Sequence, residues 1–331
     1  MSEKTNIYEI AQELGISTTT VSRAISGKGR LSEATRQRVL EYIASRNLDP
    51  CVRKRKYTDK KTGNILVTIP AEKDYALLPY FMEILSSVYD YCVIRGFQVM
   101  MAKTGANDID ALKTIISKHK VDGVVLTRTI TDALDIKFLK ERGVPFVAIG
   151  SYDDKTVSQV DVDQMSGCRD LTSILLRMGI RKIALFCADR THVVTKSRLK
   201  GFLQAYEDND LDFDPQMIFD GAGEVFKAEQ LTEEMLKKGV ECILCMDDNI
   251  CINVLNTLRK NGVRVPQDIR IASFYNSQVL NEYYPPISCV DFDIKELGTM
   301  AARVLLEALD GEEKAGKITM GYNVILKEST K

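Results

Sequence analysis

The chain has 331 residues, of which 45% are hydrophobic, and its formal net charge is −1. This length exceeds that of one typical domain, so two or three domains with sizeable cores are expected. The sequence has no run of 18 apolar residues, and its first residues, MSEKTNIYEI, lack the form of a secretion signal, which excludes a membrane-spanning helix and predicts a cytoplasmic protein.

The first predicted element is a short helix with clear signals at both ends. Asn6 is a good N-cap, and Glu9 stands where its side chain can reach back to the cap, so the helix should begin at about Ile7. Its apolar face ends at Leu14, and Gly15 follows at the position where a left-handed C-cap residue is needed. The first helix should therefore stop abruptly at a tight turn.

A second helix is predicted after Ser17 or Thr18 as its cap, and Ser32 caps a third. Apolar residues at helical spacing form the buried side of the second helix: Val21, Ala24 and Ile25. Its other side carries groups that hydrogen bond: Thr18, Thr19, Ser22 and Arg23. Residues 6–36 thus have the order of a helix-turn-helix DNA reader, in which the N-terminal residues of the second helix reach base edges.

The charge distribution favours a nucleic-acid partner for this segment. Residues 1–63 hold 13 Lys and Arg against 7 Asp and Glu, whereas residues 64–331 hold 32 against 39. A basic segment on an acidic body suits a polyanionic partner. Arg23 could read a guanine bidentately, and the threonine methyl groups could contact thymine. The alternative is a three-helix unit that serves packing alone.

The run ISTTTVSRAIS, followed by LSEATRQRVLEYIASRNLDP, resembles the headpiece of the lactose-repressor (LacI/GalR-type) family of bacterial transcriptional regulators. The resemblance implies that Thr18, Thr19 and Arg23 read bases. It also implies that further side chains contact the DNA backbone: Tyr8, Ser17, Thr20, Ser22, Ser26, Ser32 and Thr35. The expected partner is double-stranded operator DNA.

Residues 51–63, CVRKRKYTDKKTG, form a predicted basic hinge. In the family that this chain resembles, the hinge folds on DNA and inserts leucines into the minor groove, and Tyr57 stands at the place of the intercalating leucine. Such wedges are normally apolar and unstack a base step at a cost of about a few kcal/mol. The six basic residues between positions 53 and 61 indicate stronger reliance on phosphate contacts. A disordered basic linker is the alternative.

From Asn64 onward, apolar strand-like runs alternate with amphipathic helical segments. One set is NILVTIP, FQVMMAK, VDGVVL and PFVAIGS, and a second set is SQVDVD, KIALFCA, ECILCM and RIASFY. This alternation predicts parallel βαβ winding in two lobes, with a ligand cleft at the carboxyl ends of the strands. Late in the chain, CVDFDIKELGTMAARVLLEAL predicts a strand and a helix, and GYNVILKE a final strand; we expect these to return to the first lobe.

The predicted fold class is therefore α/β, with an all-α helix-turn-helix headpiece and a two-lobed core of doubly wound parallel sheets. We expect the headpiece at 1–50, the hinge at 51–63 and the core at 64–331. Lobe 1 should hold about 64–160 and 292–331, and lobe 2 about 161–291. The resemblance implies the same architecture, because stretches such as VDGVVL, SRLKGFLQAY and YYPPISCV match the family's core, which is similar to periplasmic sugar-binding proteins.

The resemblance also implies a site for a small-molecule effector in the cleft. Arg198 matches an arginine that grips the effector, and its fork suits hydroxyls, carboxylate or phosphate. Tyr80 and Phe81 match an aromatic pair, and Asp247 and Asp248 follow the strand CILCM, where carboxylates can accept ligand hydroxyls. The alternatives are a surface role for the arginine and a core role for the aromatic pair.

Two further residues complete this predicted site. Arg128 follows the strand VDGVVL and could add positive charge. Tyr275 stands where the family often has an aspartate that accepts ligand hydroxyls, so a sugar held in the usual way is not implied. A sugar, a phosphosugar and an acidic metabolite all stay open as effector classes.

Other motifs give little support to metal, redox or enzymatic function. The eight cysteines are scattered through apolar runs, which indicates reduced thiols. Cys242 and Cys245 form a CxxC, but a strand points their side chains to opposite faces, and the only histidines are His119 and His192. GAGEVF, at 221–226, ends in Phe where a dinucleotide fingerprint has Gly, and is predicted to be a loop. No cofactor and no catalytic residues are expected.

The predicted function is a DNA-binding transcriptional regulator, a repressor, whose affinity for its operator is controlled by a small metabolite bound between the lobes. Sugars and phosphosugars are the favoured effectors. A homodimer without a membrane partner is expected, because Lys331 closely follows the last predicted strand and leaves no leucine-rich tail for tetramers. The alternative is a solute-binding or sensor protein that acts without DNA.

Overall fold

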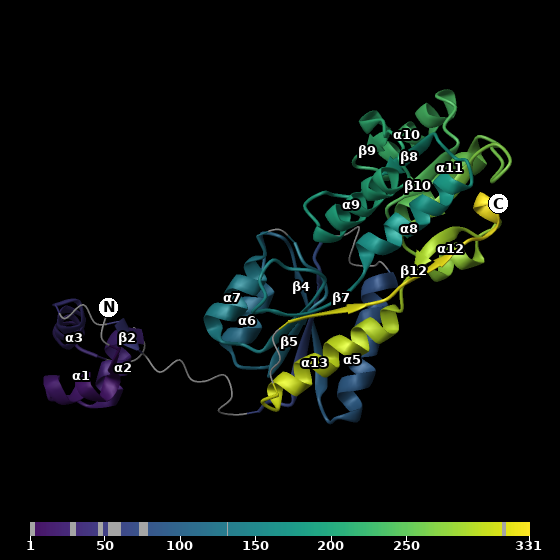
Figure 1. Ribbon diagram of the computed structural model, residues 1–331. Helices are drawn as coiled ribbons and strands as arrows, with labels where there is room; N and C mark the ends of the chain where they lie inside the picture. The colour runs from purple at the N-terminus through teal and green to yellow at the C-terminus, as the bar shows by residue number, and fades with distance from the viewer. Residues whose placement is uncertain are drawn as a thin grey trace. The chain divides into compact units, whose positions relative to one another are not determined.

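The computed structural model describes residues 4–26, 31–45, 49–51, 61–72, 79–130, 132–312 and 316–331. The chain divides into two compact units, Met1–Lys61 and Thr62–Lys331. We call the first unit the headpiece and the second the core (Figure 1). Tyr57 and most of the predicted hinge lie outside the described residues. Within the described part of the chain, every helix is too short or too polar to span a bilayer.

The headpiece is built on three helices around a small apolar core. The helices are α1 (Ile7–Leu14), α2 (Thr18–Ser26) and α3 (Glu33–Ser45). Their buried side chains are Ile10, Ala11, Leu14, Val21, Ala24, Val39 and Ile43. The sequence did not predict a short parallel pair of strands, β1 (Lys4–Asn6) and β2 (Asp49–Cys51), which joins the two ends of the headpiece.

The turn between α1 and α2 has the predicted geometry. Gly15 has a φ of +64°, a left-handed conformation that glycine adopts without strain. Its amide donates to Gln12 O (3.3 Å), and the amide of Ile16 donates to Ala11 O (3.0 Å), the bond pair of a Schellman motif. Ser17 Oγ then accepts from the amide of Thr20 (3.1 Å), so the cap of α2 is Ser17.

Lobe 1 of the core is a parallel sheet covered by helices. In sheet order its strands are β13 (Lys317–Met320), β7 (Ser158–Val162), β6 (Phe146–Ile149), β5 (Gly123–Leu126), β3 (Asn64–Pro70) and β4 (Gln98–Thr104). Its helices are α5 (Pro79–Ile94), α6 (Asp110–Ser117), α7 (Leu134–Arg142) and α13 (Ile294–Leu309). The late helix α13 packs against α5, as Figure 1 shows in yellow and blue.

Lobe 2 repeats this arrangement with one antiparallel edge. Its strands, in sheet order, are β14 (Asn323–Ile325), β12 (Ser288–Asp291), β11 (Arg270–Ser273), β10 (Cys242–Cys245), β8 (Ile183–Phe186) and β9 (Ile218–Phe219), of which β14 is antiparallel to β12. Its helices are α8 (Gln164–Arg177), α9 (Val193–Asp208), η1 (Pro215–Met217), α10 (Val225–Lys237), α11 (Asp248–Lys260), α12 (Gln278–Glu282) and η2 (Glu328–Thr330). The predicted α/β class with two parallel sheets is confirmed.

Two assignments of segments to lobes were wrong. SQVDVD was placed with the second set of strands, but β7 pairs with β6 and β13 in lobe 1. Both strands predicted late in the chain, β12 and β14, belong to the sheet of lobe 2, so only α13 and the unpredicted β13 return to lobe 1. The chain crosses between the lobes after β7, β12 and β13. Which lobe a strand joins is decided by its pairing with strands far along the chain, and the local sequence pattern does not encode that pairing.

Close packing of α8 against α9 sets the position of the ligand-facing end of α9. A Cβ on Gly201 of α9 would lie 2.1 Å from Met165 O and 3.0 Å from Met165 C of α8. Backbone atoms cannot yield as a flexible side chain can, so only glycine fits at this crossing.

Gly201→Ala should therefore lower the free energy of unfolding by about 1–3 kcal/mol, the usual cost of overpacking, despite the better helix propensity of alanine. In calorimetry this should lower Tm by several degrees. Gly223→Ala is the control, because no atom lies within 4 Å of the added Cβ. Equal melting temperatures for the two variants would contradict the packing constraint.

Candidate functional site

The headpiece directs its predicted base-reading side chains outward. Thr19 and Arg23 of α2 are exposed and Thr18 is half-buried, whereas Val21 and Ala24 on the opposite side are buried. The side chains of Tyr8, Ser22 and Ser26 lie outside the described residues. In the described part of the headpiece, Thr19 and Arg23 are thus exposed on the side of α2 where the sequence predicts DNA contacts.

The predicted backbone-contacting hydroxyls come in two matched pairs at helix starts. Ser17 Oγ lies 2.8 Å from Thr20 Oγ1, and Ser32 Oγ lies 2.6 Å from Thr35 Oγ1. Each serine also accepts from the backbone amide of its threonine, at 3.1 and 3.2 Å. All four hydroxyls therefore stand at helix N-termini, where amides and dipole favour an anion such as a phosphate.

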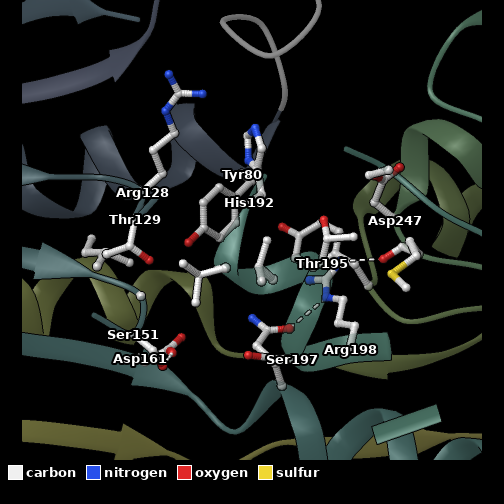
Figure 2. Close-up of a pocket in the computed structure, with 18 of the residues that line it drawn as sticks. Tyr80, Arg128, Thr129, Ser151, Asp161, His192, Thr195, Ser197, Arg198 and Asp247 are labelled. Carbon is white, nitrogen blue, oxygen red and sulfur yellow. Dashed lines mark hydrogen bonds between the residues drawn. The ribbon is translucent and has the colours of Figure 1, made fainter. Parts of the chain in front are cut away.

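The core contains a pocket between its two lobes, at the carboxyl ends of strands from both sheets (Figure 2). It encloses about 960 Å³ of space, part of which is open to solvent. All the effector-binding residues predicted from the sequence line it: Tyr80, Phe81, Arg128, Arg198, Asp247, Asp248 and Tyr275. The structure thus brings together side chains that are up to 195 positions apart in the chain.

Arg198 lies at the centre of the lobe 2 wall. It is 8% exposed, its Nε donates to Gln164 Oε1 (2.8 Å), and its Nη1 donates to Met246 O. Its guanidinium also lies 5.8 Å from the centre of the Tyr275 ring. These two bonds use Nε and Nη1, which leaves Nη2 as a donor for a ligand. The alternative of a surface arginine is excluded by its burial.

Aromatic rings from the two lobes meet in the pocket. Tyr80 of α5 packs edge-on against Phe81 (5.0 Å between ring centres) and against Tyr275 of lobe 2 (5.9 Å). Burial, with the charge of Asp161 adding to it, raises the pKa of Tyr80, so this phenol stays protonated and able to donate. Figure 2 shows the Tyr80 hydroxyl among the other labelled residues of the pocket.

Asp247 and Asp248 stand where β10 ends and α11 begins. Asp247 caps α11, since its Oδ1 accepts from the amide of Ile250 (2.8 Å). Burial raises the pKa of Asp247 to about 6; the charge of Asp248 adds to this effect, whereas the Ile250 amide and Arg198 oppose it. Burial also raises the pKa of Asp248, which is 5% exposed. The two carboxylates are thus crowded together at the pocket.

The guanidinium of Arg128 is engaged elsewhere. Its Nη2 donates to Glu72 Oε2 (2.9 Å), Glu72 Oε1 (3.0 Å) and Thr104 O (3.2 Å). Burial acts to raise the pKa of Glu72, but the hydrogen bond from Arg128 opposes burial, and the pKa is lowered overall. Figure 2 shows the Arg128 guanidinium directed away from Ser151 and Asp161. Arg128 therefore lines the pocket mainly with its stem and brings little uncompensated charge.

Sequence reasoning missed several residues that line the pocket, among them Ser151, Asp161, Thr129, His192, Thr195 and Gln164. Asp161 was detectable, because it is a charged residue inside the apolar strand run SQVDVD. His192 was seen only as a histidine without metal-binding neighbours. It forms an antiparallel bridge with Ile130, which joins the backbones of the two lobes beside the pocket. Burial, with Arg128 adding to it, lowers the pKa of His192 and favours the neutral ring.

The other sequence motifs are structural. Cys242 and Cys245 are the two ends of β10, and both are fully buried. Burial raises the pKa of Cys242 to about 12, which keeps it a thiol. In the described ranges, no three His, Cys, Asp or Glu side chains are grouped so as to hold a metal ion. GAGEVF is a turn that leads into α10 at Val225.

The chain matches two family models: "Bacterial regulatory proteins, lacI family" over residues 6–50 and "Periplasmic binding protein-like domain" over residues 172–330. It is 27% identical to the HTH-type transcriptional regulator DegA of Bacillus subtilis (99% of this chain, 98% of DegA) and 27% identical to the HTH-type transcriptional repressor PurR of Haemophilus influenzae (98% of each). A solved structure of the transcriptional regulator CelR in complex with cellobiose is similar, with 26% identity and a TM-score of 0.75 over 98% of this chain and all of that one.

A helix-turn-helix headpiece joined to a two-lobed binding core defines a class of ligand-responsive DNA-binding proteins. The whole-length likeness in fold and sequence narrows this class further. The chain belongs to the lacI family of bacterial regulatory proteins and is a DNA-binding transcriptional regulator. The predicted resemblance is confirmed.

The raised pKa of Asp247 makes the stability of the core depend on pH. The carboxyl ionises less readily in the folded chain than in the unfolded one, so its ionisation destabilises the fold. The free energy of unfolding should therefore fall as the pH rises from about 4, the unfolded value, to about 6.

Asp247→Asn keeps the helix cap, because Asn caps as well as Asp, but cannot ionise. It should be more stable than the wild type at pH 7.5 by about 1–3 kcal/mol, since a tenfold change in a dissociation constant is worth about 1.4 kcal/mol. At pH 4 the two should be equal. Urea unfolding measures both, and Asp247→Ala, which also loses the cap, is the control. An unchanged pH dependence in Asp247→Asn would refute this origin.

Proposed function

We propose that this regulator is a repressor that binds a palindromic operator as a homodimer, and that a neutral, hydroxyl-rich metabolite controls its affinity for DNA. The main observation in support of this proposal is that both lobes contribute polar and aromatic side chains to one pocket. Tyr80 and Asp161 come from lobe 1, whereas Arg198 and Tyr275 come from lobe 2. A ligand in contact with all four favours the closed arrangement of the lobes.

The charges around the pocket support a neutral sugar over a phosphosugar or an acidic metabolite. Asp161, Asp247 and Asp248 are buried or half-buried acceptors for ligand hydroxyls. Arg198 supplies the positive charge that opposes these carboxylates, because the charge of Arg128 is offset by Glu72. A phosphate would meet more negative than positive charge. The CelR structure, which is a complex with cellobiose, adds support for a sugar.

An effector can control DNA binding if it binds one arrangement of the two lobes more tightly than the other. A ligand shifts such an equilibrium only by as much as it prefers one arrangement. The bridge between Ile130 and His192 joins the two lobes beside the pocket, so a ligand that also contacts both lobes would stabilise the arrangement in which this bridge forms. Dimeric helix-turn-helix proteins read two half-sites at fixed spacing, which gives lobe closure a route to operator affinity.

The homodimer is supported by an apolar stripe on α5. Met82, Tyr89 and Val93 are exposed and recur at intervals of seven and four residues, which places them on one face of the helix. Exposed apolar groups that share a face are typical of protein contacts. We propose that a second copy of the chain covers this stripe, since two headpieces are needed to read a palindrome. Sedimentation velocity measures whether the protein is a dimer.

The effector is best identified by thermal stabilisation, because a ligand specific to the native state raises apparent stability by mass action. We expect Tm to rise with one or more neutral mono- or disaccharides, cellobiose among them, and not with phosphosugars or dicarboxylic acids. Arg198→Met, which preserves the packing of the stem, should remove this shift. Arg177→Met, an exposed arginine of α8, is the control. A shift with phosphosugars alone would overturn the neutral ligand.

DNA recognition is tested with sites that the protein selects from a random library. Arg23→Ala should cost about 1–3 kcal/mol at one base pair of the selected site if Arg23 reads a guanine edge. An equal loss on every sequence would make Arg23 a phosphate contact. If no DNA is selected, although a sugar raises Tm, the proposed palindromic operator is overturned.

A further inference from the structure

A polar cluster around the buried carboxylate of Asp161, on the lobe 1 side of the pocket, has surplus capacity to accept hydrogen bonds. Asp161 Oδ2 accepts from Ser151 Oγ (2.5 Å), and its Oδ1 accepts from the amide of Val162 (2.8 Å). Lys317 Nζ donates to Ser151 Oγ (2.6 Å) and lies 3.7 Å from Asp161 Oδ2. A carboxylate has about four lone-pair sites, so Asp161 retains room for a donor from the pocket.

The cluster lies where the lobes are joined. Asp161 is on β7, two residues before Asp163, whose side chain caps α8 of lobe 2 by accepting from Ser166 N (3.0 Å). Lys317 begins β13, the strand that leads directly to β14 of lobe 2. The two strands that precede these crossings, β7 and β13, thus both contribute a side chain to the cluster at one carboxylate that lines the pocket.

We propose that Asp161 determines effector specificity by accepting a hydrogen bond from an effector hydroxyl, and that Ser151 and Lys317 position it and link occupancy of the pocket to lobe closure. The proposal rests on the proposed function, and it adds the residues that select the effector and link its binding to lobe closure. Asp161 thereby takes, from the opposite lobe, the role of charged acceptor that an aspartate at position 275 would have and that the neutral phenol of Tyr275 does not supply.

The geometry favours a recognition role over a purely structural one. Asp161 is 8% exposed, and burial raises its pKa, so the fold retains a carboxylate at a position where a smaller neutral residue would suffice for the strand. Figure 2 shows Ser151 and Asp161 side by side and across the view from Arg198 and Asp247. A ligand that donates to Asp161 and accepts from Arg198 would span the two lobes.

Positioning by Lys317 has a physical basis in the shared hydroxyl. Ser151 Oγ accepts from Lys317, so its own proton is directed to Asp161. An effector hydroxyl that donates to Asp161 partly offsets the negative potential that Lys317 faces, and Lys317 is the first residue of β13. The position of a crossing strand thus becomes sensitive to the ligand.

The chain offers a matched control with the same chemistry outside the pocket. Asp154 in lobe 1 accepts from Lys140 Nζ (2.5 Å) and from Thr156 Oγ1 (2.7 Å). It does not line the pocket. Asp154→Asn and Lys140→Met therefore report the cost of losing an Asp–Lys–hydroxyl cluster of lobe 1 without any effect on ligand recognition.

The experiment uses the full-length protein, a DNA site selected from a random library, and a panel of neutral sugars that includes glucose, maltose and cellobiose. Asp161→Asn should weaken binding of the sugar that stabilises the wild type by about 10- to 100-fold in calorimetry, because a charge-assisted hydrogen bond is lost. Asp154→Asn should bind it as the wild type does. Ser151→Ala should weaken binding in the same direction, and replaces Asp161→Asn as the test if that variant does not fold.

Lys317→Met separates affinity from coupling. Its sugar affinity should fall less than that of Asp161→Asn, while the sugar concentration for the half-maximal change in DNA binding should rise by about fivefold or more, beyond the fall in affinity. Lys140→Met should change neither quantity. If Lys317→Met also leaves both unchanged, the coupling role is overturned.

The outcomes distinguish this proposal from the function on which it rests. If no neutral sugar stabilises the wild type, the proposed effector class fails, and the role of Asp161 fails with it. If a sugar stabilises the wild type and Asp161→Asn equally, only the role of Asp161 is overturned. Loss of the effect in Asp161→Asn, with retention in Asp154→Asn, supports the proposal.

Discussion

The buried guanidinium of Arg198 is the interaction on which the ligand-facing part of lobe 2 depends. A charge that leaves water costs about several kcal/mol unless partners and opposite charge replace the solvent. Gln164 and the carbonyl of Met246 supply the partners. They come from the start of α8 and the end of β10, so one side chain of α9 fixes two other segments around the pocket. The tight crossing at Gly201, one turn further along α9, holds the arginine at this depth.

The same arginine explains why carboxylates are tolerated in a half-enclosed space. Asp247 and Asp248 gain opposite charge from Arg198, but not enough to offset their burial, and the pKa of each is raised. The fold therefore carries an excess of acceptors at the pocket. Hydroxyl donors from a ligand would satisfy these groups, and a ligand that is itself anionic would not. The pairing of Arg128 with Glu72 sharpens this preference, because it withdraws a positive charge that the sequence suggested for the ligand.

The sequence predicted those features that local chemistry decides. Helix α1 spans Ile7–Leu14 and is followed by Gly15 in the predicted left-handed conformation, and β3 covers the predicted run NILVTIP. Most of the predicted pocket residues were found because they follow predicted strands, and the carboxyl ends of parallel strands lie at the same edge of a sheet. What failed depends on partners far along the chain. Nothing local to SQVDVD indicates its pairing with β6 and β13, and nothing in VDGVVLT indicates that Glu72 neutralises Arg128.

Rigid geometry in lobe 1 gives the pocket a mechanical connection to the start of the core. The carboxylate of Asp122 accepts from Thr62 N (2.6 Å), Thr62 Oγ1 (2.9 Å) and Gly63 N (2.8 Å), so the first residues of the core are clamped to the amino end of β5. From there β3 runs the depth of the sheet, about 20 Å for seven residues. At its far end Thr68 O accepts from Thr127 Oγ1 (2.6 Å), and Thr127 lines the pocket. A central parallel strand bonded on both sides does not bend readily, so a displacement of lobe 1 at the pocket must appear at Thr62 as well. The chain that leads from the headpiece enters the core at that residue, so the proposed ligand control of DNA binding has a route through β3.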